Sequence, residues 1–416
     1  MSAIALELPT ASSEGGGIRL LTVAHMVNDA NQSALPALIP WLVSHHGLSL
    51  ATAATLVLAM NLSSSVVQPL FGHLSDRKSF AWVIPASVLL ACCGTALIGL
   101  APNLPWMLAG ALVAGVGVAA FHPEGSRFAN YFAGAKRATG MSWFTLGGYL
   151  GFALGPILVT PLILTFGLHG TAFLVIPGIV MSALLLRELP KFEEVRRVAH
   201  HAHRERAGAD RWGAFGVLTG VVALRSMTFL AAVTFLPIFA ITVTHASNAL
   251  ASVALAALLI GGALGTILGG RLADRHDRRR IVSASMVFTA LFAGAITYCG
   301  FHSPSFALLV PLGIGFGAAL GLSASVIVVI GQEYLPRRIG MASGVTLGLA
   351  VTIGGLAAPM FGAIGDRYGL PPVFAAITVF AILSLALSFF MPSSGAQTQV
   401  PGPQLSPGKP IVASAP

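Results

Sequence analysis

A short pattern that closes one apolar segment returns near the middle of the chain, and this duplication is the strongest constraint on the fold. The sequence GHLSDR at 72–77 recurs as GRLADR at 270–275. Each copy lies where a long apolar segment ends and a short basic loop begins. Two similar halves built from membrane helices, each with the same charged turn, are typical of secondary transporters rather than of receptors or channels.

Further matches between the halves follow in the same order along the chain. They pair Leu35-Pro36 with Leu236-Pro237, Gly115 and Gly117 with Gly313 and Gly315, Gly140-Met141 with Gly340-Met341, Thr145-Leu146-Gly147 with Thr346-Leu347-Gly348, and Pro156 with Pro359. An ordered series of this kind indicates an internal repeat rather than chance similarity.

The composition requires a nonaqueous environment. Of the 416 residues, 55% are hydrophobic and only 9% are charged, whereas a soluble domain carries about 25% charged residues. The net charge of +9 does not indicate nucleic acid, because the Lys and Arg residues lie in short loops between apolar segments. The three cysteines lie in apolar segments without metal-binding spacing, so we interpret them as helix-packing residues. We expect no metal and no cofactor.

The apolar segments predict an all-α membrane protein, because backbone groups in lipid must bond within their own helix. Twelve segments are long enough to cross about 30 Å of hydrocarbon, at 18–44, 51–71, 80–101, 104–121, 138–164, 166–187, 214–242, 249–270, 281–300, 305–329, 340–364 and 371–391. We therefore expect twelve transmembrane helices in two pseudo-symmetric six-helix bundles. The predicted regions are an N-terminal tail (1–17), a first bundle (18–187), a linker or short surface helix (188–213), a second bundle (214–391) and a disordered tail (392–416).

The loops differ in charge from one side of the membrane to the other. All Lys and Arg residues of the loops lie on the side of the N-terminus, except Arg367, which is next to Asp366. The positive-inside rule then places both termini in the cytoplasm, and we expect a multi-pass membrane protein.

The duplicated turn is a candidate gate between the halves. Gly72 and Gly270 would let another helix approach closely. Asp76 and Asp274, followed by Arg77 and Arg275, could pair with an arginine or with the N-terminus of another helix. The alternative is that these residues only cap loops and set the topology.

Asp29 is a candidate proton carrier. It lies about 15 Å into the first helix at 1.5 Å per residue, and a carboxylate at that depth usually faces a cavity and has a function. His25 lies on the same helix face, and Asn28 is adjacent. The alternative is a structural polar cluster that ties this helix to a neighbour.

Arg225 is the candidate contact for a substrate. It is alone among apolar residues, about 20 Å into the seventh segment, and its planar guanidinium suits a carboxylate or phosphonate. A pair with Asp29 across a central cavity is the other interpretation. We include Asn28 and Arg127 among the candidate substrate contacts.

The end of the fourth segment holds a second cluster. Pro123 is expected to end or kink the helix, Glu124 and Arg127 are three residues apart and can pair, and a solvated His122 would titrate near neutral pH. This cluster is either a second proton site or gate, or a helix-end ion pair.

The fifth segment carries a stripe of small residues. Gly147, Gly151 and Gly155 lie on one face, followed by Pro156, which predicts close packing and a bend. The chain has no phosphate-binding loop, zinc-protease motif or nucleophile elbow, so neither ATP drive nor an enzyme is expected.

These features together resemble the major facilitator superfamily over residues 18–391. The residues of the duplicated turn match the loop signature of that superfamily, although Lys78-Ser79-Phe80 departs from it, and the fifth-segment stripe resembles a motif of drug–proton antiporters.

Within the superfamily, the chain resembles the fosmidomycin resistance protein family. The residues that carry the resemblance are His25, Asp29, Leu35-Pro36, the stretch from Phe121 to Arg127, Leu224-Arg225-Ser226 and Phe235-Leu236-Pro237. The resemblance implies a protein of the bacterial inner membrane that drives efflux of a small, anionic or amphipathic compound with protons, by alternating access. The expected partners are this compound, protons and lipid, with no nucleic acid, and we expect a monomer. The alternatives are uptake by proton symport and, from another class, a membrane-embedded enzyme or sensor.

Overall fold

The computed structural model describes residues 11–78, 80–206, 208–349, 352–353 and 356–393. Helices account for nearly all of these residues, and no strand occurs among them. The first half consists of α1 (Ala11–His46), α2 (Leu50–Ser65), α3 (Gln68–Arg77), α4 (Val83–Leu100), α5 (Leu104–Phe132), α6 (Arg137–Phe166), the 3₁₀ segment η1 (Gly167–Leu174) and α7 (Val175–Arg187). α8 (Leu189–Arg206) follows as the connection between the halves.

The second half repeats this pattern of long helices. It consists of α9 (Trp212–Thr242), α10 (Asn248–Ala273), α11 (Arg278–His302), α12 (Phe306–Tyr334), α13 (Ile339–Gly344), the π-helical segment η2 (Val345–Leu349), α15 (Ala358–Tyr368) and α16 (Leu370–Ser388). Each of the twelve predicted spans coincides, within the described residues, with one helix or with consecutive helical segments.

Nine helical stretches in the described residues are long and apolar enough to cross a membrane. One of them, Arg137–Arg187, contains 51 residues and includes two of the predicted spans. α1 is not among the nine, because His25, Asn28, Asp29 and Asn31 lower its hydropathy. The eleventh predicted span is also missing, because it is divided among α13, η2 and α15.

Two boundaries differ from the prediction. α1 already begins at Ala11, inside the predicted N-terminal tail, whereas residues 1–10 and 394–416 of the tails lie outside the described residues. α5 continues through Pro123 to Phe132, although the proline was expected to end or kink this helix near 121. A proline inside a helix removes only one backbone bond, and tight packing against neighbouring helices allows the helix to continue.

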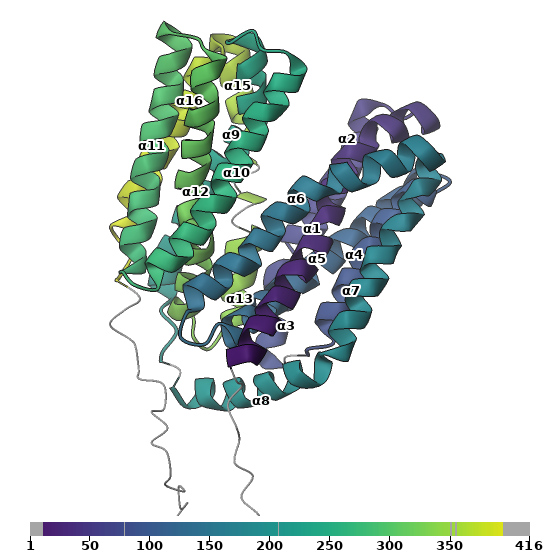
Figure 1. Ribbon diagram of the computed structural model, residues 1–416, viewed down its shortest axis with the longest axis vertical. Helices are drawn as coiled ribbons and strands as arrows, with labels where there is room; N and C mark the ends of the chain where they lie inside the picture. Colours follow the sequence, from purple (N-terminus) through teal and green to yellow (C-terminus); the bar gives the residue numbers. More distant parts are fainter. Residues whose placement is uncertain (1–10, 79, 207, 350–351, 354–355, 394–416) are drawn as a thin grey trace, which may run out of the picture.

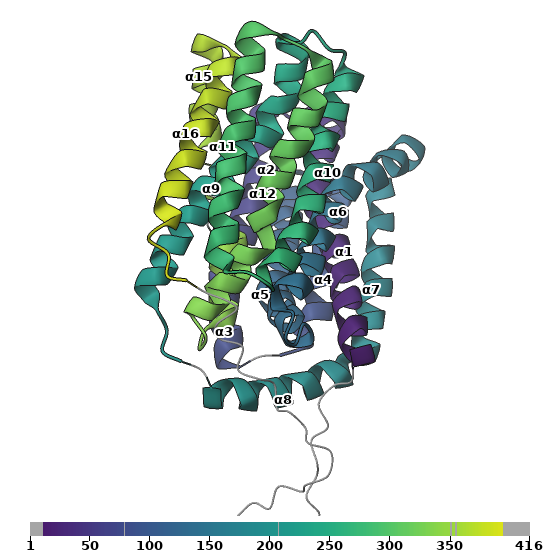
Figure 2. The same cartoon turned by 60° about the vertical axis from the view of Figure 1, so that its left-hand side comes forward.

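The two halves form separate bundles that meet at one end. α3 packs against α13, and α6 packs against α10, near the end where α8 lies. From there the ribbons of the two bundles diverge toward the opposite end (Figure 1). The beginning of α1 and the end of α16 lie at the α8 end as well (Figures 1 and 2).

α8 runs across the end of the molecule, where it joins the bundles (Figure 2). Phe192 anchors it, because its ring lies 5.0 Å from that of Phe128 and 5.1 Å from that of Phe132, both in α5. Apolar residues on one face of α8 therefore bury against the first bundle, and of the predicted alternatives for this segment the structure has the surface helix.

Glycine stripes bring helix pairs into backbone contact. Along α6, a Cβ at each glycine of the predicted stripe would overlap a carbonyl of α1; the pairs are Gly147 with Thr22, Gly151 with Met26 and Gly155 with Ala30. A second stripe, on α10, meets carbonyls of α12 in the same way; these pairs are Gly261 with Ile314, Gly265 with Ala318 and Gly269 with Leu322. Without a hydrophobic driving force between helices in lipid, such close approach is what holds them together.

Replacing Gly155 by Val should therefore destabilise the protein, because the new side chain would overlap the α1 backbone at Ala30 and Ala34 as well as the Ser33 hydroxyl. Overpacking of this kind costs about 1–3 kcal/mol, and the midpoint of thermal unfolding in detergent should fall. Gly216→Val is the matched control, because a Cβ at Gly216 has no atom within 4 Å. Equal midpoints for the two variants would contradict the role of the stripe.

Candidate functional site

Asp76 at the end of α3 joins the two bundles. Its Oδ1 accepts the backbone N–H of Gly340 at 2.8 Å, and its Oδ2 accepts that of Met341 at 2.9 Å. Both amides belong to the first turn of α13, in the other bundle. A helix N-terminus has unpaired N–H groups and a positive dipole end, so it is a suitable partner for a carboxylate.

Asp274 makes the corresponding contact in the opposite direction. Its carboxylate accepts the backbone N–H groups of Ala138 and Thr139, each at 2.9 Å, at the N-terminus of α6. The glycines of the duplicated turn lie beside these contacts: a Cβ at Gly72 would overlap the backbone of Gly340, and one at Gly270 would overlap that of Ala138. The duplicated sequence thus forms two equivalent contacts between the bundles at the α8 end.

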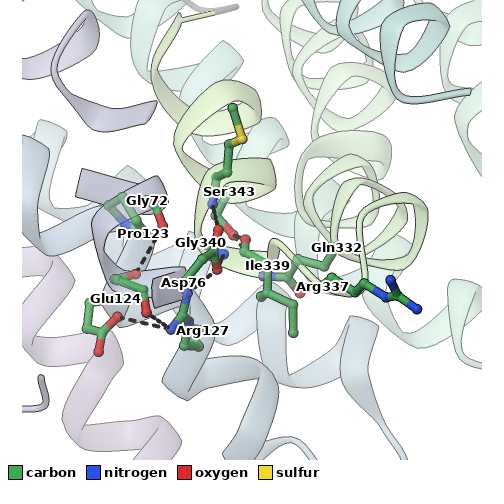
Figure 3. A network of polar contacts seen from close by, with 12 residues as sticks. Gly72, Asp76, Pro123, Glu124, Arg127, Gln332, Arg337, Ile339, Gly340 and Ser343 are labelled. Carbon is green, nitrogen blue, oxygen red and sulfur yellow. Dashed lines mark hydrogen bonds and ion pairs between the residues drawn. The ribbon is translucent and has the colours of Figure 1, made fainter. Parts of the chain in front are cut away.

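Arg127 of α5 belongs to the first of these contacts (Figure 3). Its Nη2 donates to Asp76 Oδ1, its Nη1 donates to the Ser75 carbonyl at 2.5 Å, and Glu124 Oε2 lies 3.9 Å from Nη1. Arg127 is 4% exposed. The structure places this candidate substrate contact in the junction between the bundles, where it holds Asp76 in position.

The surroundings of Asp274 differ from those of Asp76. Arg278 of α11 lies 3.8 Å from Asp274 and pairs with Glu333 of α12. Arg77 and Arg275, which follow the two aspartates, are exposed at the same end of the molecule. The carboxylate contacts are therefore symmetric, whereas the arginines around them are not.

A third polar contact crosses between the bundles and was missed by the sequence analysis. Asn130 Nδ2 of α5 donates to Gln332 Oε1 of α12, and Gln332 Nε2 donates to Ser343 Oγ of α13 at 3.0 Å. All three residues are buried, and Gln332 and Ser343 lie beside the Asp76 contact in Figure 3. The available signal was that both Asn130 and Gln332 are polar side chains near the end of a long, largely apolar helix.

The predicted proton site is a cluster of three buried side chains from α1 and α5. His25 Nε2 lies 3.1 Å from Asp29 Oδ2 and 3.2 Å from His122 Nε2, and His122 Nε2 lies 3.5 Å from Asp29 Oδ1. Asn28 donates to Asp29 Oδ1 at 3.2 Å. The structure thus brings together His122 and Asp29, which are far apart in the sequence.

The glycines of α6 make room for this cluster. A Cβ at Gly148 would lie 2.9 Å from the His25 ring and 3.1 Å from Asp29 Oδ2. Among the described residues, this is the one group of three His, Cys, Asp or Glu side chains whose ligand atoms all lie within 4.8 Å of one another. Such a group can share a proton or surround a cation.

Arg225 of α9 is bonded only to neutral groups within its own bundle. Its Nε donates to Ser323 Oγ at 3.0 Å, and its Nη2 donates to the Leu320 carbonyl at 2.7 Å, both in α12. It is 6% exposed, and within the described residues no ion pair joins it to a carboxylate. The suggested pair with Asp29 is not formed, because Asp29 binds its own partners in the other bundle.

Fold and site together are those of a membrane transporter built from two helical bundles, and comparison with known proteins gives its family. The model of the Major Facilitator Superfamily matches residues 21–346 and 218–414. The chain belongs to this superfamily, whose members are transporters and not enzymes.

Two relatives are similar over almost the whole chain. An uncharacterized MFS-type transporter, YfnC of Bacillus subtilis (strain 168), is 30% identical over 387 residues, which cover 90% of this chain and 92% of that protein. The fosmidomycin resistance protein of Escherichia coli (strain K12) is 28% identical over 396 residues, which cover 92% and 94%.

Solved structures share the fold at low identity. The transporter FucP in its outward conformation has a TM-score of 0.70 at 14% identity and covers 91% of this chain and 99% of its own. The proton:xylose symporter XylE has a TM-score of 0.71 at 14% identity and covers 93% and 98%. The fold expected from the sequence is thus confirmed.

Asp76→Asn should weaken the contact at the α8 end. The asparagine side chain has one oxygen and one NH₂ group, and this NH₂ group cannot accept a hydrogen bond from the backbone N–H groups of Gly340 and Met341. A hydrogen bond to a charged group contributes about 1.5–3 kcal/mol, so the open population at this end should rise about 10- to 100-fold. A cysteine at the buried position Ser343, in a background without the three native cysteines, should then react faster with a membrane-impermeant maleimide.

Asp277→Asn is the control for this measurement, because Asp277 caps α11 through the Arg280 N–H within one bundle. It should leave the labelling rate at position 343 unchanged. Equal rates for the unaltered protein and Asp76→Asn would show that the carboxylate does not hold the bundles together.

Proposed function

We propose that this protein exports a small anionic or amphipathic compound in exchange for protons, across the bacterial inner membrane and by alternating access. The observation that carries the proposal is the division of buried charge between the bundles. One bundle holds a carboxylate with two imidazoles, and the other holds Arg225 without an acidic partner in the described residues.

The location of the basic residues supports an orientation with the α8 end in the cytoplasm. Arg77, Lys136, Arg187 and Arg275 lie in or beside the connections at that end, whereas Arg367 lies at the other end. Loops rich in Lys and Arg stay in the cytoplasm. In this orientation both ends of the chain are cytoplasmic. The two bundles then contact each other on the cytoplasmic side.

Arg225 supports an anionic substrate. A buried guanidinium that donates only to a hydroxyl and a carbonyl keeps its full charge, and an anion is the ligand that best compensates for it. The similarity to a fosmidomycin resistance protein agrees with this, because fosmidomycin carries an anionic phosphonate. The compound carried by this chain need not be the same.

The cluster of His25, Asp29 and His122 supports coupling to protons. Its three side chains are buried in one bundle, and burial disfavours a net charge, so a proton bound there would be released when the cluster becomes accessible from the opposite side of the membrane. Exchange of a proton for substrate follows if the two bundles rock about the contacts made by Asp76 and Asp274.

Arg225→Ala should impair the export of anions selectively. Loss of charge-assisted bonds amounts to about 1.5–3 kcal/mol, which is about a 10- to 100-fold rise in the half-saturating concentration. The test is substrate efflux and growth on fosmidomycin in a drug-sensitive strain, with Arg280→Ala, an exposed residue, as control. Equal losses for neutral and cationic compounds would contradict an anion site.

Asp29→Asn should leave insertion and folding intact but abolish proton-coupled transport, because the cluster loses its negative charge. Substrate flux against an imposed pH gradient in proteoliposomes measures this, and the exposed Asp366→Asn is the control. Coupling that is unchanged in Asp29→Asn would exclude the residue from this role. If substrate and protons move in the same direction in the unaltered protein, the function is uptake by proton symport and not export.

A further inference from the structure

The hydrogen bonds of the two buried histidines fix where their protons lie. His25 Nδ1 is 2.7 Å from the Phe144 carbonyl, and His122 Nδ1 is 2.8 Å from the Val118 carbonyl. A carbonyl oxygen only accepts hydrogen bonds, so each Nδ1 carries a hydrogen. In its neutral form, each ring therefore presents the lone pair of Nε2 to the cluster.

These lone pairs meet further lone pairs. The two Nε2 atoms are 3.2 Å apart, and Asp29 Oδ2 lies 3.1 Å from His25 Nε2. With both rings neutral and Asp29 ionised, the three side chains would place three acceptors at hydrogen-bond distance with no donor between them. The arrangement requires at least one additional proton.

The distances distinguish the places that this proton could take. On Asp29, it would leave the two Nε2 lone pairs facing each other at 3.2 Å. On His122, it would leave the His25 lone pair facing Asp29 Oδ2 at 3.1 Å. On His25 Nε2, the proton lies within reach of two acceptors, His122 Nε2 and Asp29 Oδ2. The lone pairs that still face each other are then those of His122 Nε2 and Asp29 Oδ1, which are 3.5 Å apart. A proton on each ring would bring two N–H groups together at 3.2 Å.

The surroundings also favour a cation at His25 and an anion at Asp29. The His25 ring is stacked on Phe144, with 4.2 Å between ring centroids and an interplanar angle of 27°. Asn28 donates to Asp29 Oδ1, which stabilises the ionised carboxylate and leaves Oδ2 for His25.

Other charged groups near the cluster are engaged elsewhere. On α5, Glu124 lies toward Arg127. On α1, Arg19 donates to the Gly15 carbonyl. α6 contributes the Phe144 ring and glycines. Within the described residues, the protonation of the cluster is thus decided by its own three side chains.

We propose that the buried proton resides on Nε2 of His25, that Asp29 stays ionised as its counter-ion, and that His122 is the neutral acceptor of the proton. In the transfer, the Nε2–H bond of His25 breaks and an Nε2–H bond of His122 forms, with no change in net charge. The transport role of this step rests on the proposed function, whereas the location of the proton does not.

The test is ¹⁵N NMR of histidine-labelled protein in lipid nanodiscs at about pH 8, where solvated imidazoles, with pKa about 6.5, are neutral. The chain has 12 histidines, and one doubly protonated ring is expected. His25→Gln should remove this signal, whereas His122→Gln should keep it, because the glutamine oxygen can still accept from His25. No doubly protonated ring, or a signal lost in His122→Gln but kept in His25→Gln, would overturn the proposal.

A second measurement covers the case in which His25→Gln does not fold. The infrared spectrum of the unaltered protein should lack a protonated-carboxyl band that disappears in Asp29→Asn, and its presence would place the proton on Asp29 instead. Neither spectrum depends on transport. If the imidazolium is found but a pH gradient drives no flux, the proton is at His25 as proposed, whereas the proposed function is wrong.

Discussion

A charge buried in a bilayer is stable only where the protein supplies a partner for it, and the polar residues of this chain lie where that condition is met. Backbone amides at helix N-termini donate hydrogen bonds to Asp76 and Asp274. Asp29 is bound by imidazoles, and Arg225 donates hydrogen bonds to a hydroxyl and a carbonyl. The glycine stripes serve the same end, because only closely packed helices can hold such partners away from lipid.

These contacts divide into two kinds with different consequences for motion. The contacts of Asp76, Asp274 and Asn130 cross from one bundle to the other, so a rocking motion must break them. Those of Asp29 and Arg225 stay within one bundle and can persist through such a motion. The former residues suit a gate, and the latter suit sites that bind a ligand in both conformations.

Periodicity and duplication predicted the helices, the two bundles and the positions of Asp76 and Asp274 at helix ends. They also singled out His25, Asp29 and Arg225, because a polar side chain within an apolar segment is visible in the sequence. The partners could not be predicted in the same way. His122 joins Asp29, and Arg127 joins Asp76, through contacts between helices, which helical spacing does not specify. The glycines of α10 were likewise visible, but their contact with α12 was not.

The central claim is that two bundles rock as units about contacts at the α8 end. Pulsed EPR between spin labels tests it most directly, with one pair at Lys78 and Arg337 near the α8 end and another at Ser44 and Thr242 near the opposite end. All four positions are exposed. When Asp76 and Asp274 are both replaced by Asn, the first distance should lengthen and the second should shorten. Distances that lengthen together, or that do not change, would contradict the account.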